Sequence, residues 1–148
     1  MNFMNDEYFV DTNILVYAFD LNEPAKRKIA QTWVNDITCG KKKGMISNQV
    51  LGELFAALTK KPKNVSLTDA QIIVNGLIES PHWHKVNYHS GTIKKAMNQC
   101  ALTKNGFWDT LMMETAVENQ SAVILTENTK DFQHVSMRVV NPFKTTQK

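Results

Sequence analysis

Apolar residues recur along the chain in two patterns, short continuous runs and longer stretches with helical spacing. The short runs predict β-strands at residues 8–10, 44–47, 82–86, 121–126 and 137–140. The longer stretches predict a helix that begins at Ile14 and further helices at residues 23–38, 49–60, 66–79, 89–103 and 107–119. Because strands alternate with long helices, we expect an α/β fold, with a parallel sheet of about four to five strands flanked by helices.

Composition narrows the class of protein further. A chain of 148 residues is typical of one domain, so we expect a single domain over residues 1–148. A hydrophobic content of 43% and a charged content of 21% are ordinary for a globular protein and argue against disorder. Cys39 and Cys100 lack metal-type spacing, and such isolated thiols are typical of the reducing cytoplasm. We therefore expect a cytoplasmic protein without a signal peptide, and one that does not enter a membrane, because no apolar run approaches ~20 residues.

The charge distribution bears on the kind of partner. The net charge of +3 is mildly basic and is compatible with a polyanionic partner. Lysines gather at residues 41–43, at 60, 61 and 63, and at 94–95. Each group alone is typical of a solvated surface, but together the three groups make contact with phosphate a reasonable expectation.

An Asp-Thr-Asn triplet, residues 11–13, interrupts the first apolar run. Asp11 directly follows the predicted strand, at the end of the strand where open α/β sheets bind their ligands. On local grounds an Asx turn after the strand explains this aspartate equally well.

Two further acids lie on predicted helices. Asp109 falls among apolar positions of the helix at residues 107–119, which the pattern predicts to be largely buried, with Glu114 and Glu118 on its polar edge. A carboxylate in apolar surroundings must be paired, hydrogen-bonded or metal-bound, although a first-turn aspartate can also cap its helix. Glu53 lies at the edge of the apolar face of its own helix, where an ordinary surface glutamate is also found.

Oxygen-bearing side chains also follow the predicted strand at residues 121–126, in the segment 126–132. The carboxyl ends of parallel strands meet at one edge of a sheet, so this segment shares an edge with Asp11. Carboxylates that converge there repel one another unless a cation holds them, and oxygen ligands suit Mg²⁺ or Mn²⁺. Such ions assist the hydrolysis of phosphodiesters, a substrate that also suits the lysines.

Four segments resemble the PIN-domain family, and within it the VapC-type toxins of bacterial toxin–antitoxin pairs. In chain order these segments read FVDTNILVY, ISNQVLGEL, FWDTL and ILTEN. The resemblance spans nearly the whole chain and implies a PIN-like parallel sheet wrapped by helices. It also implies an endoribonuclease dependent on Mg²⁺ or Mn²⁺, a cognate antitoxin that blocks the site, and a homodimer.

The resemblance assigns the catalytic and metal-binding roles to Asp11, Glu53 and Asp109. Where the family often has a fourth aspartate, this chain has Asn128, whose amide oxygen can bind a metal or position a water but carries no charge. Glu127 is one acid that could compensate, although it does not stand at the matching position.

Three more side chains are expected to support the site. Asp131 is the second acid that could compensate for the missing aspartate. Thr12 and Asn13 are expected to orient Asp11 or the substrate phosphate through hydrogen bonds.

Alternatives to a nuclease remain on the sequence alone. A catalytically weak or inactive PIN-like module that binds RNA or protein is credible because Asn128 replaces an acid. A phosphatase with an aspartyl nucleophile needs a second aspartate two positions after the first, where this chain has Asn13. A zinc site at His82, His84 and His89 lacks a fourth ligand, so surface or partner-contact histidines are expected there.

The tryptophans offer possible platforms for nucleic-acid bases. Trp33 and Trp108, however, lie on apolar faces of their predicted helices. We therefore expect both indoles in the core.

Overall fold

Five parallel strands form one sheet in the structure, a computed structural model that describes residues 6–60, 65–133 and 135–144. The strands are β1 (Glu7–Val10), β2 (Lys43–Ser47), β3 (Trp83–Val86), β4 (Val123–Leu125) and β5 (Arg138–Val140). Their order across the sheet is β3-β2-β1-β4-β5, and every neighbouring pair is parallel. The predicted α/β fold with a parallel sheet is confirmed.

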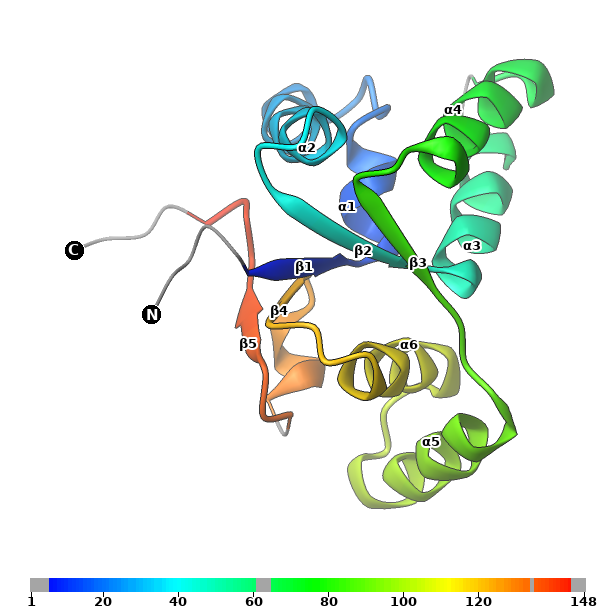
Figure 1. Cartoon of the computed structure of the whole chain (residues 1–148), viewed down its shortest axis with the longest axis vertical. Coiled ribbons are helices and arrows are strands. Elements are labelled where there is room, and N and C mark those ends of the chain that lie inside the picture. The colour runs from blue at the N-terminus through cyan, green and yellow to red at the C-terminus, as the bar shows by residue number, and fades with distance from the viewer. Residues whose placement is uncertain (1–5, 61–64, 134, 145–148) are drawn as a thin grey trace.

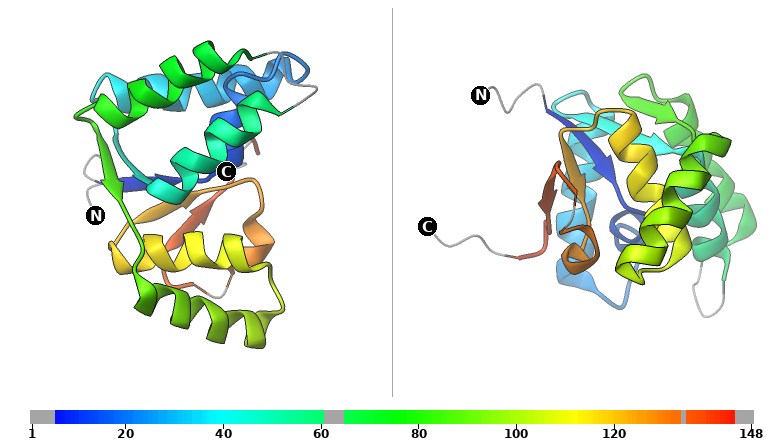
Figure 2. Two further views of the ribbon diagram at one scale, coloured as in Figure 1. Left: turned by 90° about the vertical axis from the view of Figure 1, so that its right-hand side faces the viewer. Right: turned by 90° about the horizontal axis from the view of Figure 1, so that it is seen from below.

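Six α-helices and one 3₁₀-helix connect the described strands. They are α1 (Thr12–Tyr17), α2 (Pro24–Thr38), α3 (Asn48–Thr59), α4 (Leu67–Glu79), α5 (Ser90–Thr103), α6 (Phe107–Glu118) and the 3₁₀-helix η2 (Thr129–Phe132). Figure 1 shows α1, α2 and α4 on one side of the sheet and α5 and α6 on the other. Helix α3 packs against α1 and α4, and Figure 2 shows α5 and α6 lying side by side.

Local chemistry fixes where these helices begin. Pro24 opens α2 at a position where its missing N–H has no helical partner. The Ser47 and Ser66 side chains accept hydrogen bonds from backbone N–H groups in the first turns of α3 and α4. His89 and Thr92 form a reciprocal capping box at the start of α5. Local signals at the ends of apolar stretches thus determine the residue at which each of these helices begins.

The order of the strands makes the junction between β1 and β4 the place where a ligand-binding crevice is expected in a sheet of this kind. From β1 the chain moves outward to β2 and β3, and it then returns to the other side of β1 as β4. Connections on the two sides of this point lead in opposite directions, so the loops after β1 and β4 separate at the carboxyl edge. The first of these loops carries Asp11 and the second carries Thr126, Glu127 and Asn128.

Helix α6 departs from the sequence prediction in two respects. Trp108 was expected in the core but is 58% exposed, whereas Glu114 was expected on the polar edge but is buried. Burial on α6 is continuous only from Thr110 to Ala116, where α5 and the sheet cover the helix. Helical periodicity gives the angle of each side chain around the axis, but not how far along the axis the covering elements extend. Trp33 meets the expectation more closely, since it is partly buried and packs edge-on against Tyr8.

Within the described ranges, none of the helices combines the length and the apolar character needed to cross a bilayer.

Candidate active site

Asp11 occupies the loop between β1 and α1, and it is 7% exposed. Its backbone N–H donates to the Leu125 carbonyl over 3.0 Å, which joins the end of β1 to the end of β4. Its Oδ2 atom accepts a 2.7 Å hydrogen bond from the Thr126 hydroxyl. The carboxylate is therefore fixed by the neighbouring strand, at the point where the sheet connections diverge.

The environment of Asp11 disfavours its ionised form. Burial raises the pKa of the carboxyl from 3.8 to about 6, and the charge of Asp109 adds to the rise. The Thr126 hydrogen bond and the nearby backbone N–H groups of Asn13 and Thr12 lower the pKa, but they do not outweigh burial. A buried carboxylate with a raised pKa is a feature that is common at functional sites.

Two hydrogen bonds hold the Glu53 side chain, which projects from α3 and is partly buried. Thr12, the first residue of α1, donates from its hydroxyl to Glu53 Oε1 over 2.8 Å. Gln49, one helical turn before Glu53, donates from Nε2 to Glu53 Oε2 over 2.9 Å. The same nitrogen lies 2.9 Å from the Trp108 carbonyl oxygen, so Gln49 links α3 to the first turn of α6.

Asp109 lies in the first turn of α6 and is exposed. Among the described residues, no side chain or backbone N–H donates a hydrogen bond to its carboxylate, and Gly106 occupies the N-cap position. The alternative role of Asp109 as a helix cap is therefore not realised. Although the residue is exposed, partial desolvation of its carboxyl raises the pKa, and the charges of Glu53 and Asp131 raise it further. Asp109 thus interacts electrostatically with acids on two other elements.

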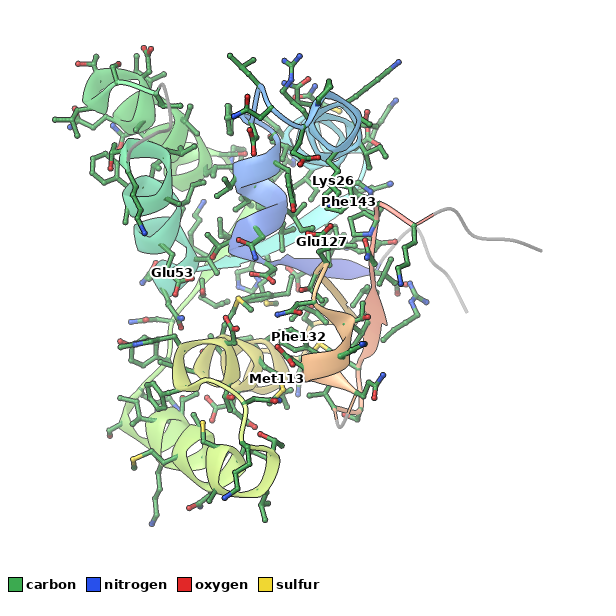
Figure 3. The ribbon with its side chains drawn as sticks, turned by 180° about the vertical axis from the view of Figure 1, so that it is seen from behind. Lys26, Glu53, Met113, Glu127, Phe132 and Phe143 are labelled. Atoms are coloured by element: carbon green, nitrogen blue, oxygen red, sulfur yellow. The ribbon has the colours of Figure 1, made fainter. Side chains whose placement is uncertain are left out.

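Asp131 stands near the position of the expected fourth acid. It belongs to η2, and with Asp109 it lines a shallow pocket over Met113 and Phe132. Figure 3 shows Met113 and Phe132 between α6 and η2. The Asn128 amide donates to Asp131 Oδ2 over 2.9 Å, so the asparagine holds the neighbouring acid.

Glu127 lies in a different cluster, away from the other acids. Its carboxylate accepts a 2.6 Å hydrogen bond from the Tyr17 hydroxyl and forms an ion pair with Lys26. Lys26 also lies over the rings of Tyr17 and Phe143. Figure 3 shows Lys26, Glu127 and Phe143 together and apart from Glu53. The structure therefore brings Asp131, and not Glu127, toward the candidate site.

Thr12 and Asn13 are placed differently. Thr12 is buried and contacts Glu53, a contact that the sequence did not predict. The Asn13 side chain is exposed and, within the described part of the chain, forms no hydrogen bond.

Gln49 and Thr126 contact the acids but were missed as functional residues. For Gln49 a signal existed, because a glutamine four positions before a glutamate lies on the same helix face. The contact of Thr126 with Asp11 joins residues 115 positions apart, and only the pairing of β1 with β4 reveals it.

The structure places some of the clustered lysines relative to the acids. Lys43 begins β2 and pairs in register with Glu7, so residues 41–43 lie at the amino edge of the sheet, opposite Asp11. Lys95 forms a 3.0 Å ion pair with Glu118. Lys61 and Lys63 lie outside the described residues. Residues 41–43 therefore do not lie beside the acids, and the expectation that these lysines contact the phosphates of a substrate stays a prediction.

The donor set is suitable for a hard divalent cation. Asp11, Glu53, Asp109 and Asp131 supply only carboxylate oxygens; the charge of Asp109 helps to raise the pKa of Asp11, and the charges of Glu53 and Asp131 help to raise the pKa of Asp109. In the ranges that the structure describes, no three His, Cys, Asp or Glu side chains are already close enough to hold one ion. The chemistry of the donors thus fits Mg²⁺ or Mn²⁺.

Comparison with known families identifies the class of protein. The family model described as PIN domain matches residues 8–137. The chain belongs to the PIN-domain family. Comparison with curated proteins gives no match.

Solved structures share the fold at low sequence identity. A toxin–antitoxin complex from Klebsiella pneumoniae has a TM-score of 0.66 and 19% identity, over 93% of this chain and 99% of that chain. VapBC2 from Rickettsia felis, bound to a promoter DNA fragment, has a TM-score of 0.63 and 18% identity, over 91% and 98%. VapC20 from Mycobacterium tuberculosis, a toxin that cleaves the sarcin–ricin loop, has a TM-score of 0.63 and 16% identity, over 88% and 98%. The chain therefore has the fold of these VapC-type structures.

Proposed function

We propose that this PIN-domain protein is a metal-dependent endoribonuclease and the toxin of a type II toxin–antitoxin pair. The observation that carries the proposal is that acids from separate elements are arranged around the point between β1 and β4 where the connections of the sheet diverge. Asp11 comes from the loop after β1, Glu53 from α3 and Asp109 from α6. Exposed Asp109 keeps this site open to a substrate, and buried Asp11 forms its floor.

Asp11 and Asp109 would hold a Mg²⁺ or Mn²⁺ ion, with Glu53 bound to it directly or through water. When bound, such an ion polarises a phosphoryl oxygen and lowers the pKa of a coordinated water. Asp131 is proposed as the fourth acid, held by Asn128 and close enough to Asp109 to raise its pKa. This arrangement would offset the loss of the aspartate at position 128.

The side chains of the chain itself have defined tasks in the hydrolysis. Thr126 fixes the orientation of Asp11, and Thr12 and Gln49 fix that of Glu53. Glu53 would accept the proton of the attacking water as the new bond to phosphorus forms. The bond between phosphorus and the 3′ oxygen would then break, and the leaving oxygen would take a proton from solvent water, which leaves a 5′-phosphate and a 3′-hydroxyl.

The proposal includes protein partners as well as RNA. VapBC2 from Rickettsia felis and the Klebsiella pneumoniae complex contain a toxin with its antitoxin, and their fold matches over nearly the whole length. We accordingly propose a cognate antitoxin, a homodimer and a cytoplasmic location for this chain. Sedimentation of the purified protein, alone and after co-expression with the neighbouring reading frame, tests the first two.

Cleavage of end-labelled RNA tests the nuclease directly. Wild type and Asp109→Asn are compared with Mg²⁺, with Mn²⁺ and with EDTA, after thermal melting has verified that both are folded. We expect wild type to cut RNA only with a metal, and Asp109→Asn to lose at least about 100-fold in rate. Glu79→Gln, a change on α4 and remote from the crevice, is the matched control and retains the wild-type rate. If wild type cuts no RNA under any condition, a catalytically inactive binding module becomes the better explanation.

A further inference from the structure

A cavity lies at the amino edge of the sheet, opposite Asp11, and the proposed nuclease leaves it without a role. It has a volume of about 320 Å³ and is lined by residues at the starts of β1, β2 and β3. Pockets that bind small molecules have volumes of roughly 300–1,000 Å³, so this cavity is large enough for a small ligand. Its lining brings together two lysines and two histidines from separate segments, Lys42, Lys43, His82 and His84.

Two walls of this cavity are held in place. Gly40 has a φ of 87°, which favours glycine, and a Cβ at this position would lie 3.0 Å from the His82 ring. The loop before β2 therefore lies directly against the His82 imidazole. Lys42 is held as well, because its Nζ atom lies 3.5 Å from the centre of the Trp33 ring and 3.7 Å from Asp36 Oδ2. A site whose side chains are already placed loses little conformational entropy when a ligand binds.

The charges in the cavity favour an anion. Among the described residues that line it, Glu7 is the only acid, and its Oε2 atom lies 2.9 Å from His84 Nδ1. Lys43 is in register with Glu7 on the neighbouring strand, yet it forms no ion pair with any residue that the structure describes. The His82 imidazole has no hydrogen-bond partner within the same described ranges. The Lys43 ammonium and the His82 imidazole are thus free to donate to a ligand.

A metal ion fits this cavity less well than an anion does. In the part of the chain that the structure describes, no three His, Cys, Asp or Glu side chains come close enough to hold one ion. His89, the third histidine of the zinc site considered from the sequence, caps α5 instead and lies 3.4 Å from Glu118. The lysines in the lining would also repel a cation.

We propose that the cavity at the amino edge binds a phosphate group through Lys43 and His82, with Lys42 adding positive charge. Phosphate oxygens accept charge-assisted hydrogen bonds from an ammonium group, and a neutral imidazole supplies an N–H donor in either tautomer. The phosphate belongs to a small phosphorylated molecule or to a nucleic-acid backbone, because both present the same chemistry. The cavity lies apart from the acids, so the inference does not depend on the proposed nuclease.

NMR of the imidazole groups tests the inference with inorganic phosphate as the probe. The chain has four histidines, so single His→Gln variants assign their signals. Phosphate is titrated into the full chain in EDTA at pH 7, with chloride replaced to keep the ionic strength constant. We expect the His82 and His84 signals to shift saturably, with a Kd of about 1 mM, while the His89 signal stays in place.

The matched variants are Lys43→Gln and Lys104→Gln, both checked for folding by thermal melting. Lys104 is an exposed lysine at the end of α5, next to Asn105, whose amide donates to the Asp131 carbonyl near the acids. Lys43→Gln should weaken phosphate binding at least about fivefold, because it removes a charged donor. Lys104→Gln should bind phosphate as wild type does.

Two further probes separate the sources of the phosphate, with the His82 signal as the readout. An oligoribonucleotide that binds at least about tenfold more tightly than a 5′-mononucleotide, and loses this advantage in high salt, identifies a nucleic-acid backbone. Equal affinities identify a small phosphorylated molecule.

Two outcomes overturn the inference. In the first, phosphate moves the His82 signal no more than chloride does. In the second, Lys43→Gln and Lys104→Gln bind phosphate equally well. Neither outcome bears on the nuclease proposal, because these titrations measure no cleavage.

Discussion

At the scale of single residues, the buried carboxylate of Asp11 is expected to destabilise the folded protein at neutral pH, although the proposed metal site needs it ionised. Its folded pKa of about 6 lies above the ordinary 3.8, so the folded state binds a proton more tightly than the unfolded state does. Without metal, the free energy of unfolding should therefore fall as the pH rises from about 4 to about 6. Above that window the ionised carboxylate costs the folded protein about 2 to 3 kcal/mol.

Asp11→Asn removes this cost, so we expect the variant to be more stable than wild type at pH 7 by up to about 3 kcal/mol. Urea unfolding in EDTA at a series of pH values measures the difference. The gap should close below pH 4, where Asp11 is protonated in both states. A variant that is less stable than wild type at pH 7 would show that the carboxylate has a structural role instead.

Gln49 is predicted to act on the reaction through Glu53. Gln49→Ala removes one of the two hydrogen bonds to the Glu53 carboxylate, and we expect kcat to fall by about 10- to 100-fold with a smaller change in KM. Asn48→Ala, next along α3 and exposed, provides the control. Single-turnover and steady-state rates separate the two parameters. Equal kcat values for Gln49→Ala and Asn48→Ala would contradict the positioning role.

The sequence was informative about the acids and much less so about what holds them. Asp11 interrupts an apolar run, Asp109 falls among apolar positions of its helix, and Glu53 lies at the edge of an apolar face. The hydrophobic pattern therefore makes these charged residues conspicuous. Gln49 and Thr126 are ordinary polar residues, and their contacts join segments far apart in the chain. Such contacts follow from strand pairing and helix packing, which periodicity does not encode.

At the scale of elements, the cluster of Lys26, Glu127, Tyr17 and Phe143 ties four segments together. It connects α2 and α1 to the loop after β4, and Phe143 adds the segment after β5. The same loop carries Thr126 and Asn128, which contact Asp11 and Asp131. We infer that this cluster holds the loop after β4 in place, and with it Thr126 and Asn128.

Glu127→Gln should lower the free energy of unfolding by up to about 1 kcal/mol at pH 7, because the ion pair is partly exposed. Lys26 first and then Tyr17 lower the pKa of Glu127 below the ordinary 4.5. Its contribution is therefore present above pH 4.5 and is lost as the pH falls through the lower folded pKa. Thermal melting at neutral and acidic pH, in low and high salt, measures it. An equal effect of the substitution at every pH and salt concentration would exclude an electrostatic origin.

The sequence predicted the helices and strands well, but it predicted less well which of their residues are buried by neighbouring elements. Strands and helices were identified because short apolar runs and capping signals such as Ser66 define them locally. The exposure of Trp108 and the burial of Glu114 depend on where α5 and the sheet end along α6. That boundary is a property of tertiary packing, and it separates the buried part of α6 from its exposed first turn.

At the scale of the whole molecule, the position of the candidate site follows from the order of the strands. Sequence alone indicated that Asp11 and the loop after β4 share one edge of the sheet. The structure adds that β1 and β4 are neighbours at the point where the connections diverge, so the two loops flank one crevice. Helices α3 and α6 then bring Glu53 and Asp109 toward it. The acids of one site thus come from segments that span most of the chain.

The most direct test of the central claim is calorimetric titration of Mn²⁺ into metal-free wild type, Asp109→Asn and Asp131→Asn at pH 7. We expect wild type to bind Mn²⁺, and each variant to bind at least about tenfold more weakly, because each loses a carboxylate at the crevice. Glu79→Gln should bind as wild type does. Failure of wild type to bind Mn²⁺, or equal affinity in wild type and Asp109→Asn, would contradict a metal site built from these acids.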